Sequence, residues 1–221
     1  MFSTCGDEME LWLIRHGVTD ANLEGRIQGR LDFPLSLLGK KEVYLLARRI
    51  RNRSFYAFFS SNLTRAKETS QIIASQIRAP LPVYSPLLQE YDWGIIQGLT
   101  RKEIGERYPL LLSQLEQDFH HAEVPGAEGM QALFRRVKVF YRFLSAFEKR
   151  NSKSLPVIVV SHGRFLQAFT LYFLGYDPGK NWPFSFSPAS LTILEGDFKR
   201  KKRMRLFNDT CHLRGKENLS G

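Results

Sequence analysis

The sequence predicts an α/β fold: a three-layer α/β/α sandwich with a mostly parallel central sheet and a helical cap. Strand-like and helix-like segments alternate along the chain, which is the pattern of a sheet covered by helices on both faces. Residues 156–160, PVIVV, are almost purely β-branched, as in a strand of a parallel sheet that is buried on both faces. Residues from about 87 to 129 lie between predicted strands without a strand pattern, so they are expected to form the cap.

Apolar runs of strand length alternate with segments of helical periodicity. In chain order, the predicted elements are strand 10–15, helix 36–51, strand 55–61, helix 63–77, strand 81–85, helix 128–149, strand 156–160, helix 164–174, strand 191–196 and strand 204–208. Ser36 marks the first helix because serine is a favoured N-cap. Pro80 and Pro82 break the second helical pattern and bound the short third strand. Thr100 and Glu103 have the spacing of a capping box, so a helix is expected to begin within the cap.

Composition is typical of a globular protein. The chain has 221 residues, of which 43% are hydrophobic and 24% charged, and it contains no repeat or low-complexity linker. Residues 1–221 are therefore expected to form one domain. Its hydrophobic runs are shorter than the ~20 residues that a membrane helix needs. Acidic residues before the first apolar run do not resemble a signal peptide, so a cytoplasmic protein is expected.

The formal net charge of +10 is concentrated near the C-terminus, in the basic segment 199–221. The run KRKKRMR (199–205) has two interpretations, a nucleic-acid contact or an exposed hairpin or tail. We favour the exposed segment, because charge attracts a partner without specifying it, and an anionic substrate would benefit from the same field. Cys5 and Cys211 lie near opposite ends and match neither a metal-binding pattern nor a disulfide framework.

Two predicted strands end in similar residues, RHG (15–17) and SHG (161–163). Ligands of open α/β sheets bind outside the carboxyl ends of the strands, so both histidines are expected at one edge. The glycine after each histidine would let the backbone turn sharply and approach a ligand. Arg65, in the first turn of the helix after the second strand, adds a second guanidinium beside a helix N-terminus. Such a cluster suits a tetrahedral anion such as phosphate.

These motifs resemble a known family. RHGVTDANLEGRIQGRLDFPLSLLGKKEV (15–43) is similar to the opening of the histidine phosphatase superfamily, which is also called phosphoglycerate mutase-like. The likeness continues through nearly the whole chain, in SSNLTRAKETS (60–70), LLQEYDWGIIQG (87–98), VVSHG (159–163) and NDTCHL (208–213). It implies the phosphoglycerate mutase-like fold and, within the family, the phosphatases that require no cofactor.

The resemblance also implies roles. His16 would be the nucleophile that takes the phosphoryl group, and Glu90 the general acid. The implied residues are, for catalysis, His16, Glu90, Arg15, Arg65 and His162 and, for substrate binding, Asn22, Gln28 and Gly163, with Ser161 in a supporting role. No metal or other cofactor is implied.

The chemistry sets requirements for these residues. Histidine attacks through an unprotonated nitrogen, so a backbone carbonyl near Gly17 is expected to hold the N–H of the other nitrogen. Two guanidiniums and a protonated His162 would stabilise the phosphoryl oxygens. Glu90 would need a raised pKa, which we expect from burial beside Tyr91 and Trp93. His120 and His121 are expected to be solvated residues of the cap, and the aromatic stretches YDWG (91–94) and NWPFSF (181–186) to be core packing.

The predicted function is metal-independent hydrolysis of small phosphorylated metabolites through a phosphohistidine, by a monomer or homodimer that binds neither membranes nor nucleic acid. Phosphoglycerate mutase is the first alternative, because QGLTRKE (97–103) resembles mutases, although the compact cap favours a phosphatase. A non-catalytic binder of phosphorylated ligands or nucleic acid is the second. Val18, Gln97 and Gly129 depart from residues that many family members carry, which weakens any transfer of substrate identity.

Overall fold

The computed structural model describes residues 9–120, 122–150, 155–177, 179, 182–197 and 201–214. Within these ranges, six strands form one sheet: β1 (Met9–Arg15), β2 (Ala57–Ser61), β3 (Val83–Ser85), β4 (Val157–Ser161), β5 (Leu191–Gly196) and β6 (Lys202–Asp209). Their order is β3-β2-β4-β1-β5-β6, and the first four are parallel while β5 and β6 add antiparallel pairs. The predicted α/β fold and mostly parallel sheet are confirmed.

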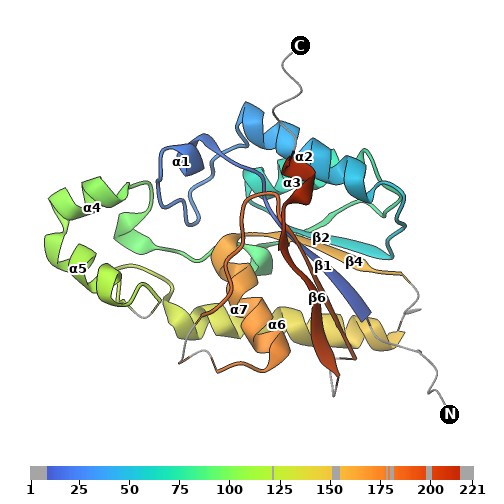
Figure 1. The fold of residues 1–221 in the computed structure, drawn as a ribbon. Helices are drawn as coiled ribbons and strands as arrows, with labels where there is room; N and C mark the ends of the chain where they lie inside the picture. Colours follow the sequence, from blue (N-terminus) through green and yellow to red (C-terminus); the bar gives the residue numbers. More distant parts are fainter. Residues whose placement is uncertain are drawn as a thin grey trace.

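Helices cover the sheet on both faces (Figure 1). The four that do so are α2 (Leu37–Ile50), α3 (Thr64–Ala74), α6 (Gly129–Arg150) and α7 (Gly163–Leu174). Alternate side chains of β1 point to opposite faces, so Leu13 packs in the core under α6 and α7 while Ile14 packs in the core under α2 and α3. Every residue of β4 is buried, as its β-branched composition predicts. These two cores make the three layers.

The region from 87 to 129 forms helical structure beside the sandwich, as predicted. Its elements are η2 (Gly94–Ile96), α4 (Arg101–Arg107) and α5 (Pro109–Gln117), preceded by η1 (Pro86–Leu88). The predicted capping box starts α4: Thr100 Oγ accepts from the Glu103 N–H, and the Glu103 carboxylate accepts from the Thr100 N–H. In Figure 1, α4 and α5 lie at the left, on the same side as the short helix α1 (Asp20–Leu23) that follows β1.

The basic segment begins in an edge hairpin. β5 and β6 pair antiparallel, and side chains of β6 alternate between exposed and half-buried. Arg203 and Arg205 form ion pairs with Glu195, and Arg205 also pairs with Glu10. Lys199 and Arg200 lie outside the described residues, as does Cys5, while Cys211 is an exposed free thiol and the first residue of η3 (Cys211–Leu213). No helix in the described part of the chain is long and apolar enough to span a membrane.

Candidate active site

Two parallel strands bring the predicted pair of histidines to one edge of the sheet. β1 and β4 pair in register with Arg15 opposite Ser161, and His16 and His162 follow directly. The two imidazole rings are buried, and their centroids are 5.1 Å apart. The predicted convergence of the two rings is confirmed.

His16 is held in the tautomer that a nucleophile needs. Its Nδ1 lies 2.8 Å from the Gly17 carbonyl oxygen, which can only accept, so Nδ1 carries the proton. Nε2 therefore has a lone pair, and Arg65 Nε donates to it at 3.2 Å. Burial, reinforced by the guanidiniums of Arg65 and Arg15, holds the pKa of His16 well below its usual 6.5. The ring is neutral at pH 7 and able to attack through Nε2.

Arg65 is fully buried, unlike a solvated helix residue. Its Nη1 donates to the Leu31 carbonyl at 2.8 Å and its Nη2 to the Gly29 carbonyl at 2.7 Å. Burial lowers the pKa of Arg65 to about 10, while Glu90 and Asp32 oppose the shift. The guanidinium is still charged at pH 7, and its three donor groups fix it beside His16.

The start of helix α3 is already occupied by a carboxylate. Asp32 accepts from the Thr64 N–H at 2.6 Å and from the Thr64 hydroxyl at 2.7 Å. The N–H of Thr64, the first residue of this helix, is therefore not free to bind a substrate anion. Asp32 caps the helix instead, and so fixes the turn that carries Arg65.

Two buried donor groups near His16 have no acceptor among the described residues. Arg15 Nη1 donates to the Phe186 carbonyl, but Arg15 Nε has no partner. His162 Nε2 lies 2.8 Å from Ser61 Oγ, whereas His162 Nδ1 has no partner. Buried N–H donors are nearly always satisfied in proteins. An oxyanion beside His16 would satisfy both.

His162 differs from the prediction in its charge. Burial lowers the pKa of His162 well below 6.5, and Arg65, His16 and Arg15 lower it further. The ring is therefore neutral at pH 7 in this structure, not protonated as the sequence suggested. A bound phosphoryl group would oppose the effect of the guanidiniums, because its negative charge favours the imidazolium.

Glu90 sits at the N-terminal end of α7. Its Oε1 accepts from the backbone N–H groups of Tyr91 at 2.8 Å and Phe165 at 3.2 Å, and its Oε2 accepts from that of Arg164 at 3.1 Å. Three N–H donors and a helix N-terminus stabilise a carboxylate. Three backbone donors therefore hold the carboxyl oxygens, which the sequence prediction did not include.

The aromatic rings near Glu90 surround the guanidinium of Arg164. The guanidinium of Arg164 lies over the rings of Tyr91, Trp93, Phe119 and Trp182, with its carbon 4.1 Å from the Trp182 centroid. It is 5% exposed, and burial lowers the pKa of Arg164 to about 10. The stretches predicted as ordinary core packing thus enclose a buried cation.

His120 belongs to the same cluster. Its Nδ1 contacts Arg164 Nη1, its carbonyl accepts from Arg164 Nη2 at 2.8 Å, and its ring stacks on Trp182. The prediction that His120 is a solvated residue is wrong, because it joins the cap to α7. His121 lies outside the described residues.

The predicted substrate-binding residues have different surroundings. Asn22 uses its Oδ1 to accept from the Thr19 N–H and hydroxyl, both at 3.1 Å, in the capping box of α1. Gln28 is 8% exposed, and its Oε1 has no partner among the described residues. A Cβ at Gly163 would lie 3.5 Å from the Arg15 guanidinium carbon. Their contact with a substrate remains a prediction.

Gly17 is required for packing more than for a sharp turn. A Cβ there would lie 2.6 Å from Val43 Cγ2 and 2.9 Å from the Gly39 carbonyl oxygen, both in α2. The glycine therefore lets α2 approach the strand end that carries His16, which differs from the predicted reason.

Sequence reasoning missed residues that hold the site without belonging to its motifs. They are Ser61, Glu128, Arg136 and Arg164. Ser161, predicted to have a supporting role, donates from its hydroxyl to the Leu88 carbonyl at 2.7 Å. The sequence signals for the others were weak: Ser61 lies in the motif SSNLTRAKETS (60–70), Glu128 lies in the segment PGAEG (125–129), and Arg164 directly follows VVSHG (159–163).

Comparison with known proteins identifies the family. The model of the histidine phosphatase superfamily (branch 1) matches residues 11–210. Phosphoserine phosphatase 1 of Hydrogenobacter thermophilus is 32% identical over 205 residues, which are 93% of this chain and 94% of that protein. An enzyme of Salmonella choleraesuis named "Probable phosphoglycerate mutase GpmB" is 33% identical over 76% of this chain and 75% of its own.

A solved structure agrees with this result. The mycobacterial glucosyl-3-phosphoglycerate phosphatase in complex with VO3 superposes with a TM-score of 0.79 at 28% identity. The match covers 90% of this chain and 99% of that one.

Proposed function

The chain belongs to the histidine phosphatase superfamily, and from this premise we propose that it hydrolyses small phosphorylated metabolites through a phosphohistidine formed on His16. One observation carries the proposal. The buried His16 has a lone pair on Nε2, which accepts from Arg65 Nε, and two buried nitrogens, Arg15 Nε and His162 Nδ1, have no partner among the described residues. That arrangement suits a phosphoryl group in front of a nucleophile.

In the first step, Nε2 of His16 attacks phosphorus while the bond from phosphorus to the ester oxygen breaks. The guanidiniums of Arg15 and Arg65 and the N–H of His162 stabilise charge on the phosphoryl oxygens. In this step Glu90 acts in its protonated form, as the general acid. Glu90 gives that proton to the departing oxygen, which leaves as an alcohol.

In the second step, a water molecule attacks the phosphohistidine. Glu90, now a carboxylate, takes a proton from the water as the new bond from oxygen to phosphorus forms. The N–P bond breaks, its electron pair returns to His16 Nε2, and inorganic phosphate leaves. Side chains supply the nucleophile, the positive charge and the proton, so the proposed route uses neither a metal nor another cofactor.

The proposal is tested with p-nitrophenyl phosphate in the presence of EDTA. We expect turnover by the wild-type protein, none by His16→Ala, and wild-type turnover by the control His212→Ala. A 32P label transferred from substrate should survive alkali and be lost in acid, as a phosphohistidine would be. Turnover by His16→Ala would contradict the proposal. So would a loss of wild-type turnover when EDTA is added.

Phosphoglycerate mutase is a second candidate, supported by the similarity to the Salmonella enzyme. A mutase must retain a bisphosphorylated intermediate and exclude water. Mutase activity would be measured as exchange between 3- and 2-phosphoglycerate that 2,3-bisphosphoglycerate stimulates. Rapid phosphate release from 3-phosphoglycerate without exchange would support the phosphatase, and a panel of phosphorylated metabolites ranked by kcat/KM would then identify the substrate.

The contacts of the basic segment support a metabolite over nucleic acid as the partner. Glu195 accepts ion pairs from Arg203 and Arg205, which neutralises part of the charge on β6. Nucleic-acid binding depends on Lys and Arg side chains that neutralise phosphates and so release the counterions condensed on the nucleic acid, and an arginine already paired with a carboxylate does this less well. A salt-dependent gel shift with single- or double-stranded DNA or RNA would contradict this part of the proposal.

A further inference from the structure

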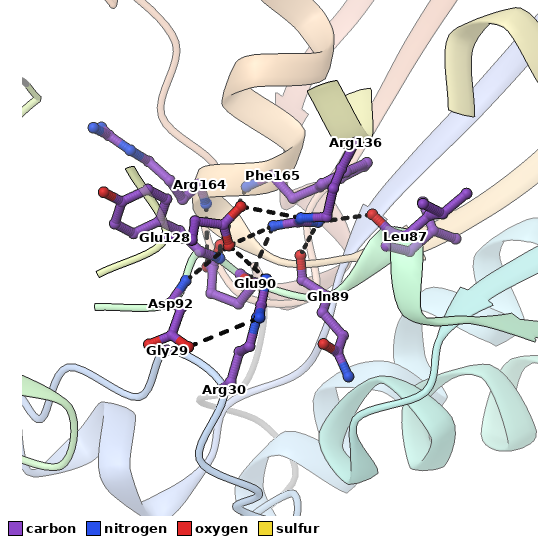
Figure 2. A network of polar contacts seen from close by, with 12 residues as sticks. Gly29, Arg30, Leu87, Gln89, Glu90, Asp92, Glu128, Arg136, Arg164 and Phe165 are labelled. Carbon is purple, nitrogen blue, oxygen red and sulfur yellow. Dashed lines mark hydrogen bonds and ion pairs between the residues drawn. The ribbon is translucent and has the colours of Figure 1, made fainter. Parts of the chain in front are cut away.

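A side chain from α6 holds the backbone on which Glu90 lies (Figure 2). Arg136 Nη1 donates to the carbonyl oxygens of Leu87 at 2.8 Å and Gln89 at 3.0 Å, and its Nη2 donates to that of Glu90 at 3.3 Å. The carbonyl between them, that of Leu88, accepts from the Ser161 hydroxyl. Four consecutive carbonyls of this loop are thus held by side chains from outside it.

Glu128 fixes Arg136 in turn. Arg136 Nε donates to Glu128 Oε1 at 3.1 Å, and Arg136 Nη2 donates to Oε2 at 2.9 Å, a two-point pairing. The Glu128 side chain is 7% exposed and that of Arg136 15%, so water competes weakly for the pair. Glu128 Oε2 also accepts from the Asp92 N–H at 3.1 Å, just beyond Glu90.

The Glu128 carboxylate also contacts the loop that holds Arg65. Arg30 Nη2 donates to Glu128 Oε2 at 2.7 Å. The residues on either side of Arg30 provide the two carbonyls that accept from Arg65. Glu128 therefore lies between the loop that holds Arg65 and the loop that carries Glu90 (Figure 2).

We propose that Arg136, paired with Glu128, is a positioning residue that fixes the Glu90 carboxyl relative to the phosphoryl-binding residues for proton transfer to the leaving oxygen. The inference rests on the proposed function, because it assigns Arg136 an effect only through Glu90. Displacing a catalytic group by about 1 Å can cost on the order of 100-fold in rate. Arg136 sets the position of Glu90 by holding three carbonyls at once, which a lysine ammonium on a flexible stem cannot reproduce.

The test compares two leaving groups in Arg136→Met. p-Nitrophenolate departs without a proton, whereas the alkoxide of an alkyl phosphate such as 2-glycerol phosphate needs one. We expect kcat/KM, which reports the steps up to formation of the phosphohistidine, to fall by about 10- to 100-fold with the alkyl phosphate, as part of the ~10²–10⁴-fold that an acid supplies. With p-nitrophenyl phosphate we expect kcat/KM to fall by less than about 3-fold, because phosphorylation of His16 by this ester needs no acid. The control Arg135→Met removes an exposed charge from the same helix and should leave both rates unchanged.

A double variant decides whether Arg136 acts through Glu90. In the Glu90→Gln background, adding Arg136→Met should cost no further rate with the alkyl phosphate, since the acid is already absent. Equal losses with both substrates, or a full additional loss in the double variant, would overturn the proposal. If Arg136→Met does not fold, the same comparison is made with Arg136→Lys and Glu128→Gln. In each, the rate with the alkyl phosphate should fall more than the rate with p-nitrophenyl phosphate. Absence of wild-type turnover with both substrates would instead refute the proposed phosphatase activity.

Discussion

The hydroxyl oxygen of Ser61 lies 2.8 Å from Nε2 of His162 and accepts from the Leu63 N–H at 3.3 Å. Because the Leu63 N–H already donates to this oxygen, the hydroxyl hydrogen is available to His162. A neutral imidazole that accepts at Nε2 carries its proton on Nδ1, the buried nitrogen without a partner among the described residues. We infer that the Ser61 hydroxyl donates to Nε2 and so favours the tautomer that can donate to a phosphoryl oxygen.

We expect Ser61→Ala to lower kcat/KM for p-nitrophenyl phosphate by about 10-fold, the equivalent of one hydrogen bond. Ser60→Ala is a matched control, because within the described part of the chain the buried Ser60 hydroxyl bonds only to backbone carbonyls, those of Ser61 and Ala66. Both variants should lose stability in urea unfolding, but only Ser61→Ala should lose activity. Equal kinetics in the two variants would show that Ser61 does not act through His162.

Gly29 links backbone conformation to the position of Arg65. Its φ is +54°, and a Cβ there would lie 1.9 Å from Gln97 Oε1. Gly25 has a φ of +70° but open space around its Cβ position, so Gly25→Ala should cost only the conformational strain of about 1–2 kcal/mol. Gly29→Ala should cost more in urea unfolding and also lower kcat/KM, because its carbonyl holds Arg65.

Adding Gln97→Ala to Gly29→Ala should restore part of the lost stability by removing the clash, while the strain at positive φ remains. The two alanine variants would be compared by their midpoints in urea at equal slope. Equal losses at Gly25 and Gly29 would contradict the clash with Gln97.

The two buried histidines should make the protein less stable in acid. Burial holds the pKa of His16 and His162 well below 6.5 in the folded state, so only the unfolded chain takes up these protons as the pH falls through about 6.5. The free energy of unfolding should therefore fall with decreasing pH, by at most about 1.4 kcal/mol per pH unit for each histidine. The associated stability is present above about pH 6.5 and is lost below it.

Urea unfolding between about pH 7.5 and about pH 5.5 would measure this slope, and His162→Asn should make it shallower because it removes one of the two sites. Identical slopes for the wild type and His162→Asn would show that His162 takes up its proton over the same pH range in the folded and the unfolded chain.

The convergence of His16 and His162 could be predicted because it follows from strand order. Both residues follow apolar strands, and neighbouring parallel strands end at the same edge. The start of α4 was predictable for a similar reason, since both members of its capping box lie within four residues. The four residues of α1 are too few to show helical periodicity, so it was missed.

The role of Arg136 could not be predicted. It lies beside Val137 in the longest helical pattern, where an arginine is typical of an exposed face. Its acceptors are backbone carbonyls, which every residue carries, so no residue type marks them. The hydrogen-bond donors to the Glu90 carboxylate were missed for the same reason, because all three are backbone N–H groups.

Arg164 joins the chemistry to the cap in one residue. Its backbone N–H binds Glu90, while its side chain lies on Trp182 and donates to the His120 carbonyl. A lineage that remodels the cap to admit a bulkier alcohol must do so around the same residue that holds the acid. A substitution in the cap that widens the range of substrates is therefore expected to lower kcat as well. A second substitution that restores the position of Arg164 would then be needed to recover kcat.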